Sequence, residues 1–162
     1  MLIKHFQMLA RYNKLANRKL YECAQLSDVE RKRTRSAFFK SIHATLNHIM
    51  VGDSIWLNRF EGKQIPSTKL EAILYEDFDE LQKARVAEDE RIETFAANLT
   101  EEFLDSTIGY VNNAGKTCAD PTDLLVAHFF NHQTHHRGQI HDMITQTEIA
   151  PPSLDMHRII RP

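Results

Sequence analysis

Four stretches of the chain repeat apolar side chains at alternating spacings of three and four residues, the pattern of helices that bury one face. The stretches cover about residues 2–26, 36–59, 73–99 and 120–147. Long helices with this spacing favour packing at shallow crossing angles. The pattern therefore predicts an all-α fold, in which residues 1–162 form a single four-helix-bundle domain.

The connections between these stretches predict the topology. The segment from Glu61 to Ala72 is long enough to run back along the neighbouring helices, so the second and third helices are expected to be parallel. The last helix is predicted to begin at Asp120-Pro121, because Asp is a good N-cap and Pro is tolerated in the first helical turn. It is expected to end near Thr147, ahead of Pro151-Pro152.

The segment before the last helix has a different composition. β-Branched residues flank Asn113-Ala114-Gly115, and such a turn sequence between them favours a two-stranded connection. A short β-hairpin is therefore predicted between the third and fourth helices.

Composition narrows the class of protein. The formal net charge is −2 and the pI is about 6.5, which gives no indication of nucleic-acid binding. Cys23 and Cys118 are far apart and form no CxxC pair, so a reducing compartment is favoured over a disulfide framework. The sequence shows no signal-peptide pattern and no membrane-spanning run. We expect a cytoplasmic protein with no nucleic-acid or membrane partner, and the basic run 31–35 is expected to be a solvated loop.

Histidines provide the candidate chemistry. His128, His132 and His136 are spaced four apart on the last predicted helix, so each adjacent pair lies on one face and can bind one metal ion. All three cannot ligate the same ion from one helix, because the outer two are about 12 Å apart along the axis. His48 on the second helix is the candidate third ligand. Spacing alone leaves open which pair on the last helix is used.

One acidic residue interrupts an apolar stripe. Asp53 lies on the buried face of the second helix, where it is a candidate to orient a histidine or accept a proton. The alternative is a structural role, in which its carboxylate accepts hydrogen bonds from Asn13, Asn17 or Arg85 on a neighbouring helix.

Four further residues have expected roles that follow from their positions. Gln139 is close enough in sequence to His136 to reach the same site. Gly138, inside a predicted helix, is expected to permit close helix packing. Arg85 and Glu88 both interrupt the third stripe and are expected to pair with each other.

Other metal and phosphate chemistry is disfavoured. The segment from His132 to His136 has Gln133 where zinc proteases carry the glutamate that accepts a proton from water. No glutamate has a histidine three residues later, as bundle di-iron proteins require. The sequence also contains no glycine-rich phosphate loop.

The chain resembles the DinB/YfiT-like family in segments that occur in the same order over nearly its whole length. The segments are residues 12–17, 45–56, 131–139 and 151–155. The most specific elements are Thr-Leu-Asn-His at 45–48 and His-x-x-x-His-Arg-Gly-Gln at 132–139. The resemblance implies a four-helix bundle, often dimeric, with a three-histidine metal site. Its ligands would be His48, His132 and His136, with His128 and His135 as near neighbours.

Three nitrogen ligands leave metal positions open, as in catalytic sites, and they suit Zn²⁺, Ni²⁺ or Fe²⁺. The resemblance implies a metal-dependent enzyme, such as a thiol S-transferase that joins a low-molecular-weight thiol to a small electrophile in detoxification or stress. Asp53 and Gln139 are its candidate catalytic residues, and a homodimer is expected. The alternatives are a non-catalytic metal- or ligand-binding stress protein and a dimeric scaffold. An enzyme should show a cavity beside the metal site.

Overall fold

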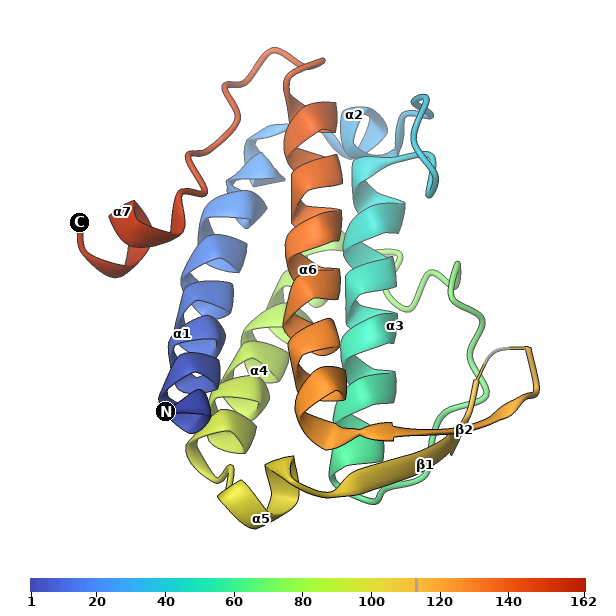
Figure 1. Cartoon of the computed structure of the whole chain (residues 1–162). Coiled ribbons are helices and arrows are strands. Elements are labelled where there is room, and N and C mark those ends of the chain that lie inside the picture. The colour runs from blue at the N-terminus through green and yellow to red at the C-terminus, as the bar shows by residue number, and fades with distance from the viewer. Residues whose placement is uncertain (113) are drawn as a thin grey trace.

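The computed structural model describes residues 1–112 and 114–162 and is mostly helical, with one small antiparallel sheet (Figure 1). The predicted turn residue Asn113 lies outside the described residues. The elements in chain order are α1 (Leu2–Leu20), the 3-10 helix η1 (Tyr21–Gln25), α2 (Asp28–Lys32), α3 (Ile42–Phe60), α4 (Phe78–Ala97), α5 (Glu101–Leu104), β1 (Thr107–Val111), β2 (Thr117–Pro121), α6 (Thr122–Ile144) and α7 (Met156–Ile160).

The four long helices α1, α3, α4 and α6 lie side by side (Figure 1). Each contacts two neighbours, in the pairs α1–α4, α4–α3, α3–α6 and α6–α1. Near the start of α3, the His43 ring lies 2.9 Å from the carbonyl oxygen of Tyr75, just before α4. Late in α4, Arg91 donates to Glu61, just after α3. The two helices are therefore parallel, and the connection between them runs back as predicted.

The predicted helix boundaries near the first connection were wrong. α1 ends at Leu20 and continues as the 3-10 turn η1, whereas the apolar pattern suggested one helix to residue 26. α3 begins only at Ile42, with the Ser41 side chain capping the amide of Ala44. The spacing misled because Cys23 and Leu26 lie beyond α1 and yet are buried in the same cluster as Leu20.

The basic run 31–35 is not the solvated loop that was expected. Its first residues form the end of α2, and Arg31 is only 8% exposed. The Arg31 guanidinium donates to the carbonyl oxygens of Ala24 and Leu26, and Arg35 pairs with Glu30. Arg31 thus supplies donors for carbonyls that the turn after α1 leaves without helical partners.

The predicted β-hairpin is confirmed. In the register of β1 and β2, Thr107 lies opposite Pro121 and Tyr110 lies opposite Cys118. β2 extends through Asp120 and Pro121, so α6 begins at Thr122 and the predicted Asp120 cap was wrong. The Asp120 carboxylate instead accepts a hydrogen bond of 2.8 Å from the Tyr110 hydroxyl.

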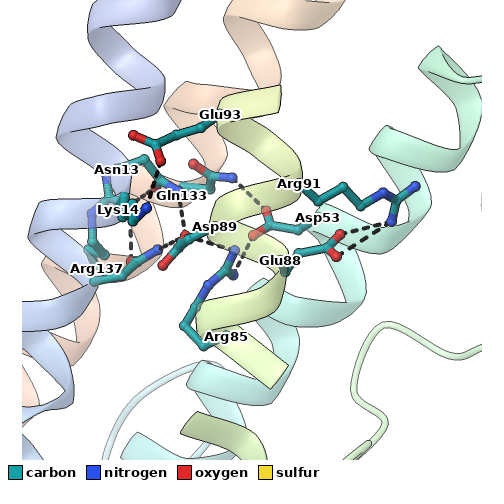
Figure 2. Close-up of polar contacts among 11 residues, drawn as sticks. Asn13, Lys14, Asp53, Arg85, Glu88, Asp89, Arg91, Glu93, Gln133 and Arg137 are labelled. Carbon is teal, nitrogen blue, oxygen red and sulfur yellow. Dashed lines mark hydrogen bonds and ion pairs between the residues drawn. The ribbon is translucent and has the colours of Figure 1, made fainter. Parts of the chain in front are cut away.

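Two apolar clusters fill the space between the long helices, with a polar layer between them. One cluster gathers around Leu46, Leu81 and Ile140, and the other around Leu57 and Ile92. On each of the four long helices, buried polar side chains lie in sequence between the residues of one cluster and those of the other. They are Asn13 and Asn17 on α1, Asp53 on α3, Arg85 and Asp89 on α4, and Gln133 and Arg137 on α6. Figure 2 shows most of this layer.

None of the helices in residues 1–112 and 114–162 is apolar over a long enough stretch to cross a bilayer.

Candidate metal centre

Three histidine side chains converge from α3 and α6. The Nε2 atom of His48 lies 3.1 Å from Nε2 of His132 and 3.1 Å from Nε2 of His136. One ligand atom from each residue lies within 4.8 Å of the other two. Nitrogen ligands placed tetrahedrally at 2.0–2.1 Å from Zn²⁺ would be about 3.3 Å apart. The spacing of these rings therefore fits a single small cation.

The hydrogen bonds on the far side of two rings show which atoms face inward. Nδ1 of His48 lies 2.8 Å from the carbonyl oxygen of Leu70, and Nδ1 of His136 lies 2.8 Å from Oε1 of Gln139. Both oxygens are acceptors, so each Nδ1 carries the proton and each neutral ring directs the lone pair of Nε2 inward. Two lone pairs then face each other at 3.1 Å with no proton between them. A bound cation removes that repulsion.

Burial also keeps these rings neutral. It lowers the pKa of His48, lowers the pKa of His132 to about 3 and lowers that of His136 to about 4. The neighbouring imidazoles lower the pKa of His132 further. Neutral imidazole is the form that binds metal, so the three side chains are in the required protonation state near pH 7.

Phe39 covers the cluster from one side. Its ring stacks on His48 with centroids 3.8 Å apart and meets His136 edge-on at 5.6 Å. Phe39 falls within the predicted helical stretch 36–59, but it lies in the loop before α3. From there it holds the His48 ring in place by direct stacking.

A cavity of 250 Å³ borders the cluster at His48 and His132. Its walls include Trp56 on α3, His128 on α6 and Tyr110 on β1. The rings of His128 and Tyr110 both lie 5.5 Å from the Trp56 ring. The cavity thus lies between the β-hairpin and the face of α3 and α6 that carries the candidate ligands His48 and His132.

The whole chain, residues 1–162, matches the sequence model of the DinB family. The chain belongs to the DinB family. It is also 25% identical over 159 residues to Protein DinB of Bacillus subtilis (strain 168), an alignment that covers 91% of this chain and 88% of the relative. The resemblance inferred from the sequence is thereby confirmed over the full length.

In this DinB-family chain, Gln139 contacts the cluster as predicted from its position. Besides its bond to His136, its Nε2 atom lies 3.2 Å from Nε2 of His135. Gln139 thus links the exposed His135 to the buried His136 and fixes which nitrogen of His136 faces inward. His128 lies on the other side of His132, with ring centroids 6.1 Å apart, as part of the cavity wall.

Asp53 lies in the polar layer and is fully buried (Figure 2). Its Oδ2 atom accepts a hydrogen bond of 2.5 Å from Arg85, and its Oδ1 atom accepts one of 2.7 Å from Gln133. Both carboxylate oxygens of Asp53 therefore accept hydrogen bonds within the protein. Arg85 is one of the partners expected if Asp53 had a structural role. Gln133 follows His132 directly, so this contact fixes the position of α6 relative to α3 beside the histidines.

Arg85 does not pair with Glu88, as the sequence had suggested. It pairs with Asp53 at 2.5 Å and Asp89 at 3.0 Å, whereas Glu88 pairs with Arg91. Burial alone would lower the pKa of Arg85, but the two adjacent carboxylates raise it above its ordinary value. The expectation failed because one helical turn separates Arg85 from Asp89, whose side chain points into the layer as well.

The close helix approach predicted for Gly138 occurs at Gly52 instead. A Cβ atom on Gly52 would lie 2.7 Å from Cε1 of His132, whereas one on Gly138 would meet no atom within 4 Å. The expectation for Gly138 was therefore wrong. Gly52 leaves the space against α3 that the His132 ring occupies.

Several residues that shape the centre were not identified from the sequence. The carbonyl oxygen of Leu70 comes from the connection before α4, and Tyr110 comes from the hairpin. No sequence motif marks either residue, and only the folded chain brings them close to α3. A signal did exist for Gln133, because it adjoins a candidate ligand and is a buried-face polar residue opposite Asp53.

Proposed function

We propose that this DinB-family protein binds one divalent transition metal ion through His48, His132 and His136. The observation that carries the proposal is the pair of inward lone pairs on His48 and His136, which face each other at 3.1 Å. Imidazole nitrogens suit Zn²⁺, Ni²⁺ and Fe²⁺. In this proposal the four long helices act as a four-helix bundle, with all three ligands on α3 and α6.

We further propose that the site is catalytic. A structural zinc site is closed by four protein ligands, whereas three histidines beside a cavity leave room for a substrate. The adjoining cavity of 250 Å³ supports this interpretation over a capped, purely structural site. A bound ion would supply Lewis-acid chemistry there, stabilising the thiolate form of a thiol or the ionised form of water at neutral pH.

The reaction that we propose is transfer of a low-molecular-weight thiol to a small electrophile. The sulfur forms a bond to the electrophilic carbon, the leaving group departs with its bonding electrons, and the thiol proton passes to solvent. Gln139 would hold His136 in the inward orientation, and Asp53 would position α6 through Gln133. Trp56, Tyr110 and His128 would exclude water from the reacting groups.

The test is metal content per chain, measured by elemental analysis on protein purified without a histidine tag. The wild type is expected to hold about one divalent ion per chain after reconstitution near neutral pH. His48→Ala, His132→Ala and His136→Ala should each lose it, while His128→Ala, a neighbour of the cluster, should retain it. A wild type that takes up no ion would contradict the proposal.

The same preparations test catalysis. Metal-loaded wild type should accelerate conjugation of a small thiol to a chlorinated aromatic electrophile, and the metal-free form should not. A protein that binds one ion but accelerates no such transfer with any thiol would instead be a non-catalytic metal-binding protein.

A further inference from the structure

The cavity beside the histidines contains one permanently charged side chain. Arg59, in the last turn of α3, lines this cavity together with Trp56 and Tyr110. Its guanidinium carbon lies 4.6 Å from the centroid of the Trp56 ring and 4.8 Å from that of Tyr110. The two aromatic rings hold the guanidinium at the wall of the cavity.

Arg59 has no acidic partner among residues 1–112 and 114–162. The one hydrogen bond that its guanidinium makes there is from Nη2 to the carbonyl oxygen of Val111, at 3.1 Å. The nearby acidic residue Glu61 is engaged by Arg91 and Lys63. This distinguishes Arg59 from Arg85, whose charge is balanced by two carboxylates in the polar layer. A guanidinium has five donors, so most of those on Arg59 remain available to a ligand.

The described lining of the cavity contains no carboxylate. Three neutral imidazoles would not cancel the charge of a divalent ion, so the ion and Arg59 would both contribute positive potential to the same small space. A low-dielectric wall of aromatic rings strengthens that potential. The electrostatics therefore favour a ligand with negative charge.

We propose that Arg59 is the anion-binding residue of this cavity and that the natural ligand is a small organic anion, with a carboxylate held by Arg59 and an apolar body against Trp56 and Tyr110. A planar guanidinium binds a carboxylate with two parallel hydrogen bonds. The volume of 250 Å³ lies just below the range of about 300–1,000 Å³ that is usual for drug-sized ligands, which suits a small molecule. The inference rests on the proposed function in one respect, namely that a bound metal ion would add to the positive potential of the cavity.

Trp56 provides a direct readout, because it is the only tryptophan in the chain and lies in the cavity wall. The experiment titrates 3-phenylpropionate and the uncharged 3-phenylpropionamide into metal-free protein and follows the fluorescence of Trp56. The carboxylate should bind about tenfold more tightly than the amide, as expected for a hydrogen-bonded charge pair. Arg59→Gln should abolish this preference and leave the affinity for the amide unchanged, and Arg59→Lys should retain part of it.

Lys69→Gln is the matched control, because Lys69 lines the neighbouring groove with Arg59 but not the cavity itself. It should leave the preference intact. Equal binding of the two probes, a preference that survives Arg59→Gln, or one that disappears in Lys69→Gln would overturn the inference. Denaturant unfolding of each variant separates loss of binding from loss of folding.

The titration is then repeated on metal-loaded protein, where the preference for the carboxylate should increase. The metal-free result stands regardless of whether the chain takes up an ion. Failure of the metal proposal and failure of the Arg59 proposal therefore give different results, the first in elemental analysis and the second in the fluorescence titration.

Discussion

The histidine cluster joins α3 and α6 and the polar layer joins all four long helices, yet these two sets of polar side chains are built on opposite principles. In the layer, Arg85 pairs with Asp53 and Asp89, and Arg137 donates to Asn13, which itself donates to Asp89. Two positive and two negative charges cancel there. In the cluster, the inward nitrogens of His48 and His136 are both acceptors and face each other without a donor between them.

The difference shows why burial of polar residues alone does not identify a functional site. Polar layers whose charges balance can fix the relative positions of helices without any ligand. Two buried acceptors that face each other call for a cation or a donor between them. We therefore assign structural specificity to the layer and chemistry to the cluster.

The largest expected effect comes from breaking the charge balance of the layer. Asp53→Ala leaves the Arg85 charge buried beside a single carboxylate, so the free energy of unfolding of the metal-free protein should fall by about 3–5 kcal/mol. His132→Ala removes a neutral ring that takes part in no ion pair, and it should cost less than about 1 kcal/mol. Urea unfolding at pH 7 measures both.

The conservative variant Asp53→Asn is the control for shape. It keeps the shape and one acceptor oxygen, but it loses the charge and places an NH2 donor against one of the two former partners, so it should fall between Asp53→Ala and the wild type. Equal destabilisation by Asp53→Ala and His132→Ala would show that the two regions do not differ as we propose.

An intermediate effect is expected from pH in the metal-free protein. An unfolded histidine has a pKa of about 6.5, whereas burial lowers the pKa of His132 to about 3 and that of His136 to about 4. Between those values the unfolded chain binds more protons, so stability is complete above pH 6.5 and falls as the pH falls toward 4. The loss from pH 7 to pH 5 should be up to about 2 kcal/mol for each of these two histidines.

The double variant His132→Ala/His136→Ala isolates this contribution. Burial raises the pKa of Asp89 to about 6, which changes stability in the opposite direction over the same range. Because the double variant retains Asp89, subtracting its free energy of unfolding from that of the wild type cancels the contribution of Asp89. A difference that does not change with pH would show that the histidines are not held neutral by the fold.

The smallest expected effect separates two glycines. Gly52→Ala places a methyl group against the His132 ring and should weaken metal binding about tenfold, as small displacements of ligands do. Gly138→Ala meets no atom and should leave metal binding unchanged, while stabilising the helix by up to about 1 kcal/mol. Competition with a chromophoric chelator measures the affinities. Equal affinities in the two variants would mean that the His132 ring adapts without cost.

Local patterns in the sequence were sufficient to predict the long helices, the hairpin and the parallel crossover, which follow from apolar spacing, turn residues and the length of a connection. The family resemblance was needed to select the three histidines that converge. Asp53 was singled out because a charge on an apolar stripe is rare, and the structure shows its partners to be Arg85 and Gln133.

The rest depended on contacts between distant segments. Apolar spacing does not distinguish a helix from a tight turn that is buried equally well, and for this reason Cys23 and Leu26 extended the first helix too far. Phe39 was predicted to lie within a helix because its position fitted the stripe. The contacts of Arg59 and Leu70 required knowledge of where the hairpin and the crossover lie.

The distance in sequence between the histidines has a consequence for biosynthesis. His48 is separated from His132 and His136 by 84 and 88 residues, and the latter two are carried by the last of the four long helices to leave the ribosome. A nascent chain that has released only α3 carries one ligand and cannot retain an ion by chelation. If all three histidines bind the proposed ion, loading would follow translation of α6, so chains still in synthesis would not compete for the metal supply of the cell.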